Sequence, residues 1–76
     1  MSFKIHSLTS AKTLLGPSGV PAGWELVCSK AVEDTASGHT GALVRNLATG
    51  VFKLCAHTIL RPVEQQEAAR IASLNR

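Results

Sequence analysis

The sequence predicts a small α+β domain, in which a three-stranded antiparallel β-meander carries a C-terminal helix on one face. A short N-terminal helix or strand precedes the meander. Three observations support this prediction: apolar and polar residues alternate between Trp24 and Thr58, Gly50 lies where a hairpin turn is needed, and apolar residues recur at helical spacing after Pro62. The chain has 76 residues, so we expect one domain, residues 1–76, because a chain of this length cannot build a second core.

The N-terminal segment fits two local structures. Phe3–His6 alternates apolar and polar residues, as a strand does, whereas Thr9 or Ser10 can cap a short helix that runs through Leu15. Gly16, followed by proline, is a typical helix end, and the helix is the favoured alternative. The next residues, 16–23, hold three Gly and two Pro and predict a surface loop without a phosphate-binding Gly-Lys-Ser/Thr motif.

One strand and a hairpin follow this loop. Trp24–Val32 reads as a strand, and Glu33–Gly41 is polar and rich in turn-forming residues. A type I turn with a glycine bulge at Ala48–Gly50 then sets the hairpin register. This register places Leu47 opposite Val51, Arg45 opposite Lys53 and Leu43 opposite Cys55 on one face, with the pairs Asn46–Phe52, Val44–Leu54 and Ala42–Ala56 on the other. The second face carries no charge, so we expect it to be the core side.

The last element is predicted to be a helix that begins at Pro62, because proline suits the first helical turn. Val63, Ile71 and Leu74 fall within a narrow arc of a helical wheel, with Ala68 beside them. We therefore expect one core, formed by Val44, Phe52, Leu54, Ile71 and Leu74.

Charge and cysteine content limit the partners and the compartment. The net charge is +3, and the Lys and Arg residues are scattered rather than clustered, which permits an anionic partner without requiring one. Two cysteines are too few for a disulfide scaffold. The N-terminus does not resemble a signal peptide, and no apolar run approaches the roughly 18–20 residues of a membrane span. We expect a cytoplasmic protein with no membrane contact.

The sequence offers weak candidates for chemistry. Cys28, His39, Cys55 and His57 are of metal-binding types, but they lack the Cys-x2-Cys spacing of structural zinc sites, so we expect no metal and no cofactor. A Cys28–Cys55 disulfide across two strands is conceivable, yet reduced thiols are expected in the cytoplasm. Cys55 and His57 lack a third group to orient the base. We therefore predict no catalytic residues, no enzyme activity and no small-molecule substrate.

The outer face of the sheet remains as the candidate binding surface. Its predicted contact residues are Leu43, Arg45, Leu47, Val51, Lys53 and His57, a mixture of apolar and cationic side chains. We predict a non-catalytic protein-interaction module that binds a larger partner, or itself as a homodimer. In size and lack of catalytic motifs, the chain is typical of accessory proteins of phages and other mobile elements, including inhibitors of host defence such as anti-CRISPR proteins.

The alternative prediction is a nucleic-acid-associated protein that uses the mildly basic sheet face. Arg45, Lys53 and His57, with Lys30, would contact phosphates. The chain has only Phe3, Trp24 and Phe52 as aromatic residues, which argues against a platform for stacked bases.

Overall fold

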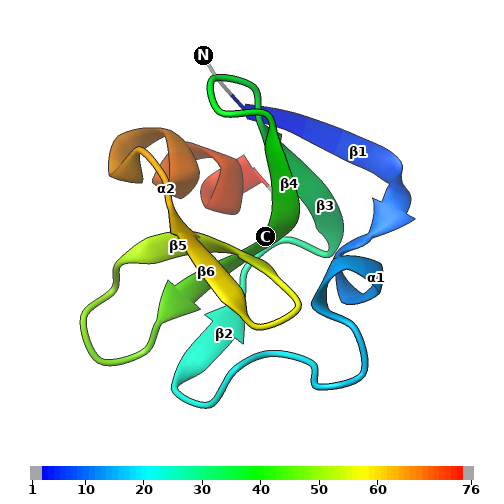
Figure 1. Ribbon diagram of the computed structural model, residues 1–76. Coiled ribbons are helices and arrows are strands. Elements are labelled where there is room, and N and C mark those ends of the chain that lie inside the picture. The colour runs from blue at the N-terminus through cyan, green and yellow to red at the C-terminus, as the bar shows by residue number, and fades with distance from the viewer. Residues whose placement is uncertain (1–2, 75–76) are drawn as a thin grey trace.

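The computed structural model of the chain describes residues 3–74, which form one antiparallel sheet flanked by two helices (Figure 1). The elements are β1 (Phe3–Ser10), α1 (Ala11–Leu15), β2 (Trp24–Leu26), β3 (Lys30–Asp34), β4 (His39–Asn46), β5 (Phe52–Ala56), β6 (Ile59–Pro62) and α2 (Gln65–Leu74). The strand order is β1-β3-β4-β5-β6, and β2 also pairs with β4. The predicted α+β class is confirmed, but the described residues form six strands where three were predicted.

The long strand β4 organises the sheet. Its first residues pair with β3, from Asp34–His39 to Val32–Gly41, and its last residues pair with β2, from Leu26–Val44 to Trp24–Asn46. The two ladders are separated by different lengths of chain on the two sides. Leu26 and Val32 are six residues apart along the chain, whereas their partners on β4, Val44 and Gly41, are three residues apart. The extra residues interrupt the strand, and the first N–H of α1, on Ala11, donates to the carbonyl oxygen of Ser29 at 2.9 Å within this interruption. The break therefore fixes the position of α1.

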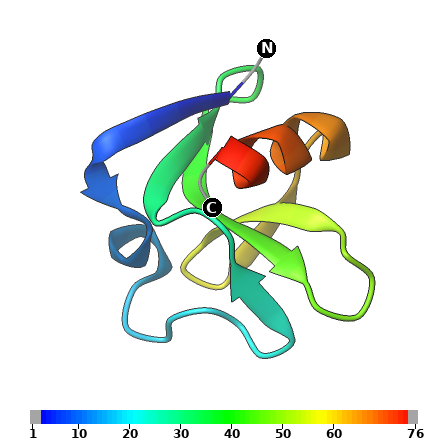
Figure 2. The same ribbon diagram turned by 180° about the vertical axis from the view of Figure 1, so that it is seen from behind.

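The sheet has a core on each face, and the two helices lie on opposite sides of β4 (Figures 1 and 2). The α2-side core contains the buried residues Cys28, Val32, Leu43, Leu54, Ala68 and Ile71. The α1-side core contains Ala11, Leu15, Ala42, Val44 and Cys55. The prediction of a single core on the Val44 face is therefore wrong, because α1 buries that face while α2 covers the opposite face, which carries Leu43.

The predicted hairpin register is wrong by one residue. The structure pairs Ala42 with Cys55, Leu43 with Leu54, Val44 with Lys53 and Arg45 with Phe52. The loop has four residues rather than three, because Asn46 already pairs with Val51 and its N–H donates to the Val51 carbonyl at 2.8 Å. The Asn46 side-chain oxygen also accepts from the N–H groups of Ala48 and Thr49, so the turn starts one residue earlier than predicted. Gly50 has φ of +77°, the left-handed conformation that the predicted glycine bulge requires.

Both N-terminal alternatives are present, one after the other. Residues 3–10 form the strand β1, and α1 follows at once, with the Ser10 hydroxyl accepting from the Lys12 N–H at 3.2 Å as an N-cap. The helix ends at Gly16, as predicted, with φ of +74°. The bare Cα of Gly16 is needed for packing as well, since an added Cβ would lie 2.8 Å from Nδ1 of His57 on the β5–β6 turn.

The C-terminal helix starts later than predicted. Pro62 is the last residue of the edge strand β6, where a missing N–H is tolerated, and α2 begins at Gln65. The Glu64 carboxylate accepts from the N–H of Glu67 at 2.6 Å and thus caps the helix. Val63 therefore lies outside the helix, and the face of α2 that packs on the sheet is formed by Ala68, Ile71 and Ala72. The assignment of Leu74 to the core is wrong, because this side chain is 67% exposed.

The side chain of Gln65 joins α2 to the sheet. Its Oε1 accepts from the Phe52 N–H at 2.7 Å, and its Nε2 donates to the Phe52 carbonyl at 2.9 Å. The carboxamide therefore takes the place of a strand residue opposite Phe52, beyond the end of the β5–β6 ladder. This contact holds the first turn of α2 against β5.

Candidate functional site

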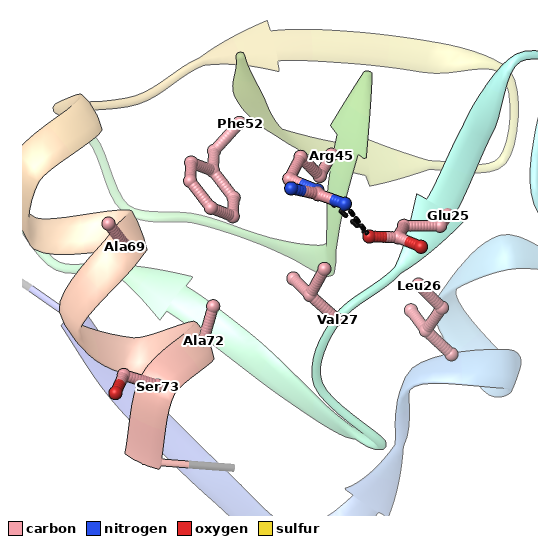
Figure 3. Close-up of a pocket in the computed structure, with 8 residues that line it drawn as sticks. All are labelled: Glu25, Leu26, Val27, Arg45, Phe52, Ala69, Ala72 and Ser73. Carbon is pink, nitrogen blue, oxygen red and sulfur yellow. Dashed lines mark hydrogen bonds and ion pairs between the residues drawn. The ribbon is translucent and has the colours of Figure 1, made fainter. Parts of the chain in front are cut away.

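A groove of about 390 Å³ lies between α2 and the strands β2, β4 and β5 (Figure 3). Its lining residues are Glu25, Leu26, Val27, Arg45, Phe52, Ala69, Ala72 and Ser73. Phe52 and Val27 are half-buried and pack against the α2-side core, so they give the groove a firm apolar floor. The groove exists because α2 presents only small side chains, Ala69, Ala72 and Ser73, to this part of the sheet.

An ion pair crosses the groove from one strand to the next. Glu25 on β2 and Arg45 on β4 are direct cross-strand neighbours, and the Nε and Nη2 atoms of Arg45 lie 2.8 Å and 2.6 Å from Oε2 of Glu25. Both contacts use the same carboxylate oxygen, and Glu25 Oε1 and Arg45 Nη1 have no hydrogen-bond partner among residues 3–74, so these two atoms can bond with another molecule. Both side chains are 40% exposed, and an exposed pair of this kind contributes about 0–1 kcal/mol to stability. The pair mainly orients two opposite charges over an apolar floor.

The predicted binding residues do not form one surface. Leu43 is fully buried in the α2-side core, with 0% exposure, so its assignment to an exposed surface is wrong. The one-residue change of register separates Arg45 from Lys53, which lies on the α1 side of the sheet opposite Val44. The predicted pair of facing cations is therefore not formed.

The remaining predicted residues are exposed at the two hairpin turns. Leu47 lies on the β4–β5 loop with 59% exposure, Val51 directly follows this loop with 37% exposure, and His57 is exposed on the β5–β6 turn. The Leu47 N–H donates to the Gly23 carbonyl at 2.9 Å, which places this loop beside the start of β2. Of the predicted set, Arg45 lines the groove.

Most of the groove was not predicted from the sequence. Glu25, Val27 and Phe52 are brought together by the β2–β4–β5 register, and Ala69 and Ser73 line the groove from α2. One sequence signal was available: opposite charges at Glu25 and Arg45 on two neighbouring strands favour a register that places them side by side.

The histidines and cysteines are dispersed. Cys28 belongs to the α2-side core and Cys55 to the α1-side core, and both are free thiols. Burial raises the pKa of the Cys55 thiol, which donates to the His57 carbonyl at 3.3 Å. Within residues 3–74, no three His, Cys, Asp or Glu side chains gather in a way that would hold a metal ion. His6 pairs instead with Glu33, at 2.9 Å, and so links β1 to β3.

Comparison with known proteins finds no matching family model, no matching curated protein and no matching solved structure. Neither of the helices in the described part of the chain has the length and apolar character needed to cross a membrane.

Proposed function

We propose that this chain is a non-catalytic protein-binding module, and that the groove between α2 and the sheet receives an apolar side chain of a protein partner. The observation that supports this proposal is the ion pair of Glu25 and Arg45 beside the apolar surface of Phe52 and Val27. In this pair one oxygen of Glu25 and one nitrogen of Arg45 remain available for another molecule. Binding sites typically combine an apolar surface with a few convergent polar groups, which fix the orientation of what they bind.

The surroundings of the groove suit a protein partner. The exposed side chain of Leu47 lies two residues beyond Arg45, on the loop that contacts the start of β2. Val51 adds a second exposed apolar side chain at the end of the same loop. Apolar residues beside a half-exposed charged pair are the usual composition of a protein–protein interface, with its apolar centre and polar rim.

The test fills the groove without disturbing the core. Ala69 is exposed and lines the groove, so Ala69→Leu should occupy the space that the partner's side chain needs. Gln66→Leu is the matched control, because it adds a leucine to an exposed position of the same helix outside the groove. Each chain carries a photo-cross-linking benzoylphenylalanine in place of Leu47 and is expressed in its native cells.

We expect a discrete cross-linked product from the parent chain and from Gln66→Leu, and a loss of at least about tenfold from Ala69→Leu. Circular dichroism should show that all three chains are folded. Equal cross-linking by Ala69→Leu, or no product from the parent chain, would contradict the proposal.

A further inference from the structure

The outer edge of β2 has free backbone groups. Val27 donates to the Leu43 carbonyl at 3.0 Å, and the Gly23 carbonyl accepts from Leu47 at 2.9 Å, so the odd-numbered residues of this segment pair with β4. Because hydrogen-bonding directions alternate along an antiparallel strand, Trp24 and Leu26 point their backbone groups away from β4.

A turn satisfies one of these outward groups, since the Trp24 N–H donates to the Pro21 carbonyl at 3.1 Å. The Trp24 carbonyl and both backbone groups of Leu26 have no hydrogen-bond partner among residues 3–74. This edge therefore offers one donor and two acceptors to an incoming chain.

A hollow lies on each side of this edge. On the α2 side is the groove described above, and on the α1 side is a pocket of about 180 Å³. The pocket is lined by Lys12, Leu15, Gly16, Gly19, Val20 and Leu26. Leu26 contributes to both hollows, and Figure 3 shows its side chain pointing from β2 towards α1, away from the Glu25–Arg45 pair.

The loop beside β2 leaves this pocket open. Gly16 and Gly19 line it without side chains. A Cβ added to Gly19 would have no neighbouring atom within 4 Å. Lys12 is exposed at the pocket and forms no ion pair among residues 3–74. The pocket is thus an apolar hollow with an unpaired cation at its side.

We propose that an extended segment of a partner protein adds to the outer edge of β2 as a further strand, with one apolar side chain in the α2-side groove and the next in the α1-side pocket. Successive side chains of a strand point to opposite faces of the sheet, so two consecutive apolar residues would fill the two hollows. In strand addition the backbone hydrogen bonds supply affinity and the pockets for alternate side chains supply specificity. An acidic residue of the partner segment next to these two apolar residues would lie close to the charged side chain of Lys12.

The other edge at this end of the sheet, β6, is less suitable. In the two-residue β5–β6 hairpin, Ala56 pairs with Ile59, and by alternation Leu60 points its backbone groups outwards. The next outward residue is Pro62, which has no N–H to offer. Leu60 nevertheless supplies a matched control, because it is also a leucine with an outward N–H on an edge strand.

The test removes the N–H of Leu26 and leaves its side chain in place. The chain is prepared by chemical synthesis with N-methyl-leucine at position 26 or, as the control, at position 60. A phage-displayed library of random linear peptides is selected on the unmodified protein, and the enriched peptides are synthesised as probes. We expect them to carry two adjacent apolar residues with an acidic residue nearby.

We expect the peptide affinity to fall at least about tenfold with N-methylation at Leu26 and to remain unchanged with N-methylation at Leu60. In the unmodified protein, the amide hydrogen of Leu26 should exchange more slowly when the peptide is bound, which tests the same hydrogen bond without any change to the chain. This inference rests on the proposed function. The Ala69→Leu variant tests the groove alone, whereas N-methylation at Leu26 tests strand addition, so the two proposals can fail separately.

Peptides that are lost on Ala69→Leu but tolerate N-methylation at Leu26, with no protection of its amide, would refute strand addition and leave the groove as a binding site. Peptides that tolerate both changes would contradict both proposals. Loss of binding on N-methylation at Leu60 alone would move strand addition to β6, and a selection without enriched peptides would also refute the inference at β2.

Discussion

Gly41 should be among the positions of this chain least tolerant of substitution, although it carries no side chain and needs no unusual backbone angle. It lies in β4 where pairing changes from β3 to β5. An alanine Cβ at this position would lie 2.8 Å from the carbonyl oxygen of Cys55, 3.1 Å from its carbonyl carbon and 3.3 Å from its nitrogen. All three are backbone atoms of a residue that is fully buried, so the neighbour cannot rotate away. Relief requires β4 and β5 to separate.

The expected cost of Gly41→Ala follows from this geometry. Overpacking a well-packed interior typically costs about 1–3 kcal/mol, and a domain of this size has a net stability of about 3–5 kcal/mol. With a urea dependence of about 1 kcal/mol per M for a small protein, the midpoint of unfolding should fall by about 1–3 M. Far-UV circular dichroism during urea titration measures this shift.

Gly50 provides the control, because its requirement is of a different kind. It has φ of +77° and open space around the position of a Cβ. Asparagine tolerates the left-handed conformation, so Gly50→Asn should change the midpoint little, whereas Gly41→Asn should be at least as damaging as Gly41→Ala. An unchanged midpoint for Gly41→Ala would refute the close approach of β4 to β5.

Three further predictions concern single side chains. His57 has φ of +57° in a two-residue hairpin turn, so His57→Gly should raise the free energy of unfolding by about 1 kcal/mol; a lower midpoint would show that the ring stabilises the turn more than the backbone strains it. Gln65→Ala should cost about 1–2 kcal/mol and speed amide exchange at Phe52, because it removes two hydrogen bonds to that residue, while Gln66→Ala should do neither. Burial raises the pKa of the Cys55 thiol, so less thiolate is present at a given pH, and Ellman's reagent should label it more slowly in the native protein than in urea; equal rates would contradict its burial.

The features that the sequence predicted correctly are local. The cap at Ser10, one of the two caps that the sequence offered, the stop at Gly16 and the left-handed Gly50 each depend on the conformation of a few neighbouring residues. Such positions are specified by steric limits on φ and by side chains that bond to adjacent backbone groups. They needed no knowledge of which strands become neighbours.

The features that were missed depend on contacts between distant segments. The hairpin register was chosen to keep charge off the core face, but Arg45 lies on that face beside Phe52, because Glu25 pairs with it from the neighbouring strand β2. The strand β6 was missed because Pro62 suits a helix start and an edge strand equally well. In both cases the local pattern had two solutions, and tertiary pairing decided between them.

The groove also depends on contacts between distant segments of the chain. The stability of the fold does not explain why it is open. A larger apolar residue at position 69 would bury more surface against Phe52 than alanine does, at about 25 cal/mol per Å². The Glu25–Arg45 ion pair on the sheet side of the groove is 40% exposed and adds about 0–1 kcal/mol. Small side chains on α2 and an oriented, half-satisfied charge pair on the sheet together keep open a space that a sequence selected for stability alone would close. A cost of this kind is expected where another molecule supplies the missing contacts. For this reason we propose the groove as the binding site, rather than the more exposed apolar residues of the hairpin turns.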